Sequence, residues 1–227
     1  MGIFSPNFQR EGAGVEKNEQ SKEGVSLFFD LFISRFWDLM KLNVIFIIYC
    51  IPIVTIFPAF GALTSMTMSI VRKKPIVFML KDFHSAFISN WKQSFVCGFL
   101  SCFLFSILYY ASVFYYKLAQ ENHILYAVFF ICTFMTILLL LAWIYIFPIL
   151  TTITLSIKDI FKNSLSLSII SLKHTLLGAF AYGLIFIGTI IYLPLVFPLI
   201  FIITISLLSF ISSFTSWPGI NEYLIEE

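Results

Sequence analysis

Charged residues are scarce in this sequence. Asp, Glu, Lys and Arg make up 11% of the 227 residues, whereas hydrophobic residues make up 59%. Soluble domains contain about 25% charged residues, and a chain of this length buries too small a share of its surface to hide so many apolar side chains from water. The composition excludes a water-soluble enzyme and predicts an integral membrane protein. Basic and acidic residues nearly balance, at 14 and 12, so we expect no nucleic-acid partner.

Cysteines and catalytic motifs are also few. Cys50, Cys97, Cys102 and Cys132 fall inside apolar runs without a CxxC spacing, which indicates buried thiols rather than a disulfide or metal cluster. The chain has no GxxxxGK[ST], HExxH or GxSxG motif, so common phosphate, zinc and acyl-transfer sites are not predicted. Acidic residues lie outside the apolar runs, which disfavours proton relays and intramembrane proteolysis. We expect no enzymatic activity, no cofactor and no metal site.

Long apolar runs are the main feature of the chain. Four stretches contain no Lys, Arg, Asp, Glu or His: residues 42–71, 93–116, 124–157 and 175–221. About 20 residues of helix cross a bilayer core, so the second and third stretches each predict one span. The fourth is long enough for two spans, and Pro194 and Pro198 predict a break between them, because proline interrupts helix hydrogen bonding.

The first stretch has two interpretations. Pro52 and Pro58 make it either one kinked span or a hairpin whose first arm begins near Phe28. The positive-inside rule favours the hairpin: it gives six crossings with both termini in the cytoplasm and leaves every basic residue except Lys117 on the inside. The alternative is five crossings plus a re-entrant helix over residues 59–71, which needs cover from other helices.

The expected fold is therefore all-α, a polytopic transmembrane helical bundle with amphipathic helices in its inner loops. One transmembrane domain is expected over residues 28–216, between a polar, flexible N-terminal tail (1–27) and an acidic C-terminal tail (217–227). The expected spans lie near residues 28–52, 58–72, 93–116, 124–150, 175–193 and 196–214. Small and polar residues within them, including Asn43, Thr67, Gly183 and Gly188, are expected to serve helix–helix packing.

Two basic inner loops are the most informative segments. In the first, RKKPIVFMLKDFHSAFISNWKQSF, apolar residues from Ile76 to Ile88 recur on one helical face, which predicts an amphipathic helix in the membrane interface. The second, SIKDIFKNSLSLSIISLKHTLLG, echoes the first, either through an internal duplication or through the same lipid constraints. The basic residues act either as topology anchors or as a docking surface. Its candidate residues are Arg72, Lys73, Lys74, Lys81, Asp82, Asn90, Lys92, Lys158, Asp159 and Lys173.

Several segments carry a family resemblance. MGIFSPN, then DLMKLNVIFIIYCIPIVTIFPAFGALTSMTMSIVRKK, then KDFHSAFISNWKQSF together resemble the YesL-like family of bacterial membrane proteins, known as domain of unknown function 624. The resemblance covers nearly the whole chain except about residues 9–24. It implies an accessory role beside binding-protein-dependent carbohydrate importers, and it carries over no catalytic residue.

Two functions follow as hypotheses. The first is an accessory or regulatory partner of a carbohydrate ABC importer, bound through the inner loops on the cytosolic side. The alternative is a permease-like subunit that moves a small solute itself, although the chain shows no EAA-type coupling loop. The expected location is a bacterial cell membrane, with a Gram-positive source suggested by the richness in Ile, Phe, Lys and Asn. The lipid bilayer is an expected partner, and a homo-oligomer is left open.

Overall fold

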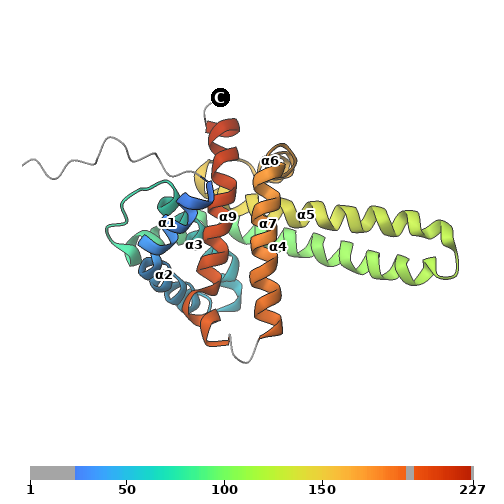
Figure 1. Ribbon diagram of the computed structural model, residues 1–227, viewed down its shortest axis with the longest axis horizontal. Coiled ribbons are helices and arrows are strands. Elements are labelled where there is room, and N and C mark those ends of the chain that lie inside the picture. The colour runs from blue at the N-terminus through green and yellow to red at the C-terminus, as the bar shows by residue number, and fades with distance from the viewer. Residues whose placement is uncertain (1–23, 193–196, 226–227) are drawn as a thin grey trace, which may run out of the picture. The chain divides into compact units, whose positions relative to one another are not determined.

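The computed structural model describes residues 24–192 and 197–225, and these residues form helices joined by short loops, with no strand among them (Figure 1). The α-helices are α1 (Gly24–Ser34), α2 (Phe36–Tyr49), α3 (Ile56–Val71), α4 (Met79–Ala119), α5 (Tyr126–Thr152), α6 (Ile157–Ile170), α7 (Leu172–Ile191) and α9 (Ile205–Ile220). Short 3₁₀ turns, η1 (Ile53–Thr55) and η2 (His123–Leu125), and π-helical turns, η3 (Ile200–Thr204) and η4 (Asn221–Ile225), extend them. The predicted all-α fold is confirmed.

Five helices are long and apolar enough to cross a membrane, judged by length and composition. They are Ile53–Val71, Met79–Ala119, His123–Thr152, Leu172–Ile191 and Phe197–Ile225. All five coincide with predicted spans or extend them, including the one predicted near residues 58–72. The sixth predicted span, near residues 28–52, is not among them. The chain is a multi-pass helical membrane protein.

The chain divides into two compact units, residues 1–34 and residues 35–227. Within its described residues, the first unit contributes α1, a short apolar helix in which Leu31 is buried. The second unit holds every other helix. The predicted N-terminal tail lies outside the described residues, except that α1 already begins at Gly24.

The predicted span near residues 28–52 is two helices in the structure. Helix α1 ends at Ser34 and α2 begins at Phe36. Arg35 between them forms an ion pair with Asp38 at 3.2 Å, and Lys41 follows one turn later on the same face of α2. These three charges leave only the opposite face apolar, so α2 buries Leu42 and Phe46 against the rest of the unit. In the predicted hairpin, the arm before the turn is helix α2, which has only 14 residues. The arm after the turn, formed by η1 and α3 together, has 19 residues.

Helix α4 joins two segments that the sequence analysis separated. The amphipathic inner-loop helix and the span near 93–116 form one continuous helix of 41 residues. Its length is about 60 Å at 1.5 Å per residue, about twice the thickness of a bilayer core. No proline or glycine interrupts residues 79–97, so nothing ends the helix between the loop and the span. The N-terminal part of α4 thus extends the span instead of lying as a separate helix in the interface.

Helices α4 and α5 form an antiparallel pair that leads away from the other helices of the second unit (Figure 1). Its turn is capped by Asn122, whose side-chain oxygen accepts a hydrogen bond from the Ile124 amide at 3.2 Å. Large apolar side chains are exposed along both helices, among them Phe99, Phe103, Phe130 and Phe134. Exposed apolar surface on this scale is a lipid-contacting surface in a membrane protein.

The packed core lies at the other end of this pair. Tyr145, Phe147 and Ile149, in the last third of α5, are buried together with Cys97 of α4 and Ile160 of α6. Pro148 has no amide hydrogen and therefore cannot bond the Ile144 carbonyl four residues earlier. Ser212 of α9 donates to that carbonyl at 2.6 Å. The proline therefore creates an acceptor that ties α5 to α9.

The final helix differs from the predicted one at its end. The expected break around Pro194 falls within residues 193–196, outside the described residues. From Phe197 the helix continues to Ile225, so the segment expected as an acidic tail from residue 217 is helical for most of its length. Trp217 and Ile220 explain this continuation: Ile220 is fully buried in the core, and Trp217 packs against it.

Candidate functional site

The end of α3 shapes the first basic loop. The Lys74 amide donates to the Ser69 carbonyl at 2.9 Å and the Lys73 amide to Ile70 at 3.0 Å, which is the hydrogen-bond pattern of a Schellman motif. Lys73 occupies the left-handed position of this motif, with φ of 55°. This turn ends α3 and leaves Lys73 and Lys74 exposed to solvent.

Arg72 is held against the last helix instead of extending freely. Its guanidinium carbon lies 4.8 Å from the centroid of the Trp217 ring, within the range of a cation–π interaction. Two residues later, Gly219 contacts the junction of α6 and α7: a Cβ at that glycine would come 2.6 Å from the Ser171 hydroxyl oxygen. The end of α9 therefore connects the first basic loop to the second. The sequence analysis did not identify Trp217 or Ser171.

The two candidate aspartates cap helices. The Asp82 carboxylate accepts from the Phe78 amide at 3.3 Å, at the start of α4. Asp159 accepts from the Ser156 hydroxyl at 2.5 Å, while its own amide donates to that hydroxyl at 3.3 Å, at the start of α6. Such reciprocal bonding satisfies amides that a helix start leaves free. Asp82 and Asp159 thus have a structural role that positions the lysines beside them.

A direct hydrogen bond joins the two loops. The side-chain amide of Gln93, in α4, donates to the Leu155 carbonyl, before α6, at 2.9 Å. Lys92 next to it is exposed, and Asn90 is half-buried. We call the surface formed by residues 72–92, 155–162 and 171–174 the basic face. It rests on the packed core, because Phe83 and Ile160 beneath it are fully buried.

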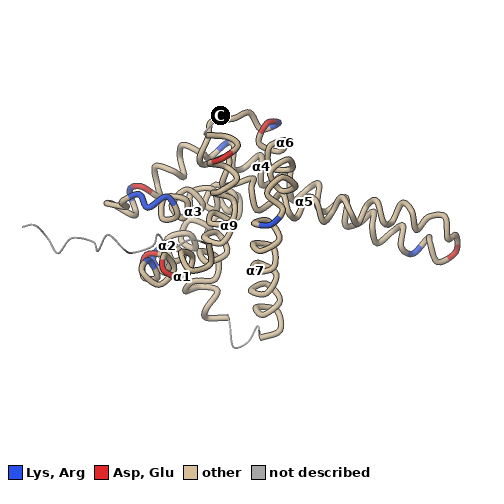
Figure 2. Tube along the Cα trace, turned by 45° about the horizontal axis from the view of Figure 1, so that its top comes forward, with Lys and Arg blue, Asp and Glu red and all other residues tan. Residues whose placement is uncertain are grey.

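The lysines of the basic face are free cations. Six candidates are exposed: Lys73, Lys74, Lys81, Lys92, Lys158 and Lys173. In the described part of the chain the ion pair formed is that of Arg35 with Asp38, and none of these lysines takes part in it. Figure 2 shows basic residues around the end of α3, at α6 and at the start of α7, with further basic and acidic residues at α2 and a separate pair of charges at the α4–α5 turn. That turn holds Lys117 and Glu121. The basic face therefore carries net positive charge.

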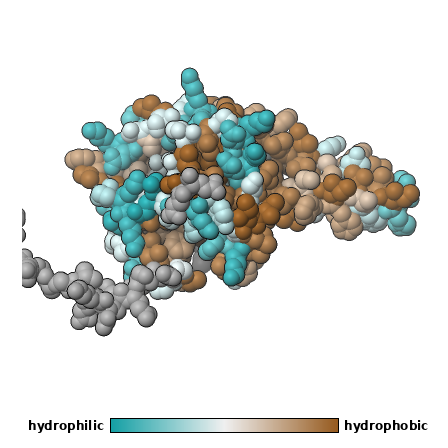
Figure 3. Space-filling view, turned by 90° about the horizontal axis from the view of Figure 1, so that it is seen from above, coloured by the Kyte–Doolittle hydropathy of each residue, from teal (hydrophilic) through white to brown (hydrophobic). Residues whose placement is uncertain are grey.

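Hydrophilic and hydrophobic residues are also distributed unevenly over the molecule. Figure 3 views the end at which α6 lies and shows hydrophilic residues over the body of the molecule, with hydrophobic residues along the α4–α5 pair. Apolar surface suits contact with lipid, and lysine side chains are favourable at a lipid–water boundary.

Residues at corresponding positions of the two basic loops are buried to the same extent. Phe83 and Ile160, which follow the Lys-Asp pair in each loop, are both fully buried, and so are Ser94 and Thr175 further along. The glycines that follow, Gly98 and Gly178, also correspond: each packs against a neighbouring helix so closely that a Cβ would overlap Phe57 or Thr215. The two segments differ in form, because the first lies within the single helix α4 whereas the second is divided at Ser171 between α6 and α7.

A buried polar seam joins α3 to α9. The Thr67 hydroxyl is 2.8 Å from that of Ser213 and 3.0 Å from that of Ser209, and Thr64 lies 3.2 Å from Ser209. All four residues are buried, and their hydroxyls satisfy one another. Small hydroxylated residues let helices in membranes approach closely and bond across the contact. Packing was expected for Thr67, whereas Gly183 and Gly188, expected to pack likewise, face open space.

Asn43 forms the most heavily bonded polar contact within the spans. Its amide nitrogen donates to the carbonyls of Ile200 at 3.0 Å and Phe201 at 2.7 Å, and its oxygen accepts from the Ser206 amide at 2.9 Å. These partners bracket the π-helical turn η3, where the regular helix hydrogen bonding is shifted. Asn43 is fully buried and fixes α2 against the final helix. Its role is structural packing, as predicted, but with a partner that the sequence does not reveal.

The described residues contain no group of three or more His, Cys, Asp or Glu side chains placed to hold a metal ion. The Tyr49 hydroxyl lies 2.8 Å from Nδ1 of His84, and this pair is exposed on the surface. The exposed lysines of the basic face can attract anionic groups.

Comparison with known proteins gives one match. The model of a family described as "Protein of unknown function, DUF624" matches residues 39–111, which confirms the resemblance to domain of unknown function 624 over that range. The matched range runs from Leu39 of α2 into the outer half of α4, and it includes Asn43, the polar side of α3 and the first basic loop. No curated protein and no solved structure matches the chain.

Proposed function

We propose that the protein is a non-enzymatic membrane subunit whose basic face docks a partner on the cytosolic side, and that this partner is a carbohydrate ABC importer. The importer is what the family resemblance implies. The docking role rests on the structure of the basic face. The same proposal places the protein in a bacterial cell membrane with both termini in the cytoplasm. This topology needs a sixth crossing upstream of Ile53, besides the five helices that are long enough to span.

The observation that carries the docking role is the hydrogen bond from Gln93 to Leu155. It holds two loops from distant parts of the sequence as one surface above a packed core. The lysines on this surface have no ion-pair partner among the described residues, so their charge is available to a partner. A preformed surface loses little entropy on binding, which favours recognition.

The orientation is supported by charge. Cytoplasmic loops of membrane proteins carry an excess of Lys and Arg. The basic face holds most of the described basic residues, whereas the turn between α4 and α5 holds Lys117. Placing the basic face in the cytoplasm satisfies this rule.

The test is capture of the tagged full-length protein from its native membrane in mild detergent, with mass spectrometry of the proteins retained. We expect importer subunits in stoichiometric amounts. Charge reversal of Lys92, Lys158 and Lys173 to Glu should abolish their retention while leaving insertion intact. Lys117→Glu, a matched reversal at the opposite turn, should have no effect.

Three outcomes contradict the proposal. The first is capture of the protein alone under conditions that preserve other importer complexes. The second is equal loss in the Lys117→Glu control, which would indicate a general effect of charge. The third is solute flux in liposomes containing this chain alone, which would support the permease alternative.

A further inference from the structure

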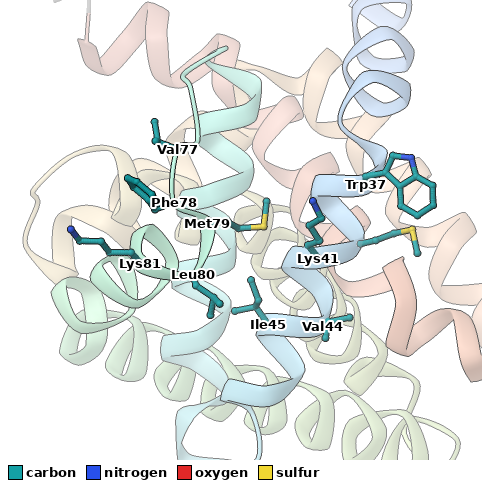
Figure 4. A pocket seen from close by; sticks show the side chains of 10 residues that line it. Trp37, Lys41, Val44, Ile45, Val77, Phe78, Met79, Leu80 and Lys81 are labelled. Atoms are coloured by element: carbon teal, nitrogen blue, oxygen red, sulfur yellow. The ribbon is translucent and has the colours of Figure 1, made fainter.

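An apolar groove lies beside the basic face, between α2 and the start of α4 (Figure 4). Its volume is about 830 Å³, within the range of roughly 300–1,000 Å³ typical of small-molecule sites. Val44 and Ile45 line it from α2, and Val77 and Leu80 line it from the opposite side. Three of these four side chains are at least half exposed, so the groove is open to its surroundings.

Two lysines are the charged groups among the residues that line the groove. Lys41 stands on the α2 wall, and Lys81 is on the α4 wall with its ammonium directed away from Lys41, so that a change of side-chain rotamer is needed for Lys81 to reach a group bound beside Lys41 (Figure 4). Both are exposed, and neither forms an ion pair with any described residue. The two nearby carboxylates are already engaged: Asp38 pairs with Arg35 at 3.2 Å, and Asp82 accepts from the Phe78 amide. The groove thus combines an apolar lining with two uncompensated positive charges.

The exposed side chain of Trp37 indicates the depth at which the groove lies in the bilayer. Its indole lies at one edge (Figure 4) and is 70% exposed. Tryptophan prefers the headgroup layer of a bilayer, and anionic lipids of the cytoplasmic leaflet attract basic residues in the same layer. The groove therefore sits where a lipid headgroup and the upper part of its acyl chain meet.

We propose that this groove binds one anionic phospholipid. An acyl chain lies along Val44, Ile45 and Leu80, and the phosphate-bearing headgroup is held by Lys41 and Lys81. The apolar lining has no role for a free phosphate, and a zwitterionic headgroup gives no net charge for the two lysines to neutralise. Lys81 belongs both to this groove and to the candidate docking residues, whereas Lys41 belongs to the groove alone. The lipid proposal does not rest on the importer partnership, because lipid binding is measured on the protein without an importer.

The experiment is native mass spectrometry of the full-length protein in detergent, titrated with phosphatidylglycerol or with phosphatidylcholine of the same chain length. We expect one phosphatidylglycerol to be retained in preference to phosphatidylcholine. Lys41→Gln and Lys81→Gln should each weaken that retention about fivefold, the effect of one basic residue near an anionic lipid surface. Lys173→Gln, which removes a charge from the basic face outside the groove, should leave retention unchanged.

A second variant tests the apolar part. Val44→Trp fills the groove from α2 without touching a charge, and it should abolish phosphatidylglycerol retention while thermal unfolding remains cooperative. Equal retention of the two lipids, or equal weakening in Lys173→Gln, overturns the proposal. So does a dimer that dissociates in Val44→Trp, which would make a second copy of the chain the occupant. Because no importer is present, failure here leaves the importer proposal untouched, and the reverse also holds.

Discussion

A buried amide in an apolar helix destabilises a protein unless its polar atoms are bonded. Asn43 meets this condition through the carbonyls of Ile200 and Phe201 and the amide of Ser206. These partners lie more than 150 residues away in the sequence. A change at Asn43 therefore acts on the final helix as well as on α2.

Asn43→Leu should lower stability, because the branched shape of the side chain is kept while its three hydrogen bonds to backbone groups are lost. We expect a loss of about 1–3 kcal/mol, seen as a lower Tm by tryptophan fluorescence in detergent. Asn90→Leu makes the same substitution at a half-buried position on α4 and should change the Tm little. Equal effects of the two substitutions would contradict the role assigned to Asn43.

At Lys73, in contrast to Asn43, a substitution is expected to raise the stability of the protein. Its φ of 55° costs a residue with a Cβ about 1–2 kcal/mol, and glycine is the usual occupant of this position in a Schellman motif. Lys73→Gly should therefore raise the free energy of unfolding by up to about 1 kcal/mol, after the greater flexibility of glycine in the unfolded chain is subtracted. Lys74→Gly removes the same charge one residue later, and it should be neutral or destabilising. A lower Tm for Lys73→Gly than for Lys74→Gly would disprove the argument.

At this scale the sequence identified residue types but not their partners. Asn43 and Thr67 stood out as polar residues in apolar runs. That Asn43 meets a π-helical turn, or that Arg72 stacks on Trp217, depends on how distant helices pack. Asp82 and Asp159 are among the docking candidates expected from the sequence, and their position in the first turn of each helix is in addition a signal for capping.

Helix contacts depend on a few glycines, and Gly178 of α7 provides the clearest test. A Cβ there would lie 2.5 Å from Cγ2 of Thr215, so Gly178→Ala must push α7 away from α9. We expect a destabilisation of about 1–3 kcal/mol, typical of overpacking. Gly183→Ala, on the same helix but with nothing within 4 Å of the added Cβ, should raise stability by up to about 1 kcal/mol through helix propensity.

The two alanine variants are to be compared by their Tm in the same detergent. Opposite signs support the close α7–α9 contact. A destabilising effect of the same size at both positions would show that flexibility, and not contact, explains these glycines.

Elements were predicted where apolar runs and charges mark them clearly. The spans near 124–150 and 175–193 correspond closely to α5 and α7. Charged residues lie on either side of the first run, and the second run is bounded by a charged segment at its start and by Pro194 at its end. The division of residues 76–116 was wrong in one respect, since an amphipathic helix and a following span share one helix when no breaker separates them. The break at Arg35 was also missed, because a single charged residue gives a weaker signal than proline.

The arrangement of the whole molecule predicts which loops share a side of the membrane. We expect Lys117→Cys, in the α4–α5 turn, to react with a membrane-impermeant maleimide added to intact cells. Lys74→Cys and Lys158→Cys, on the basic face, should react only after permeabilisation. Labelling of Lys117→Cys and Lys158→Cys from the same side would contradict the topology.

The position of the core could not be predicted from the sequence. Helix α5 is apolar along its whole length, so hydropathy does not distinguish Phe130, which is exposed, from Phe147, which is buried. Lipid and protein interiors are equally apolar, and only the packing of α3, α6 and α9 around the last third of α5 separates them. Composition therefore predicts that this protein is membrane-embedded, but not which side chains face lipid.

The continuous helix α4 has a mechanical consequence. Met79 and Ala119 are the two ends of one helix of 41 residues, about 60 Å long. Its N-terminal half is fixed in the packed body, because Phe83, Ser94 and Cys97 are fully buried. A force applied beside Lys81 therefore acts on the core as well as on the helix, and it reaches the far turn of the hairpin only together with a shift of the core.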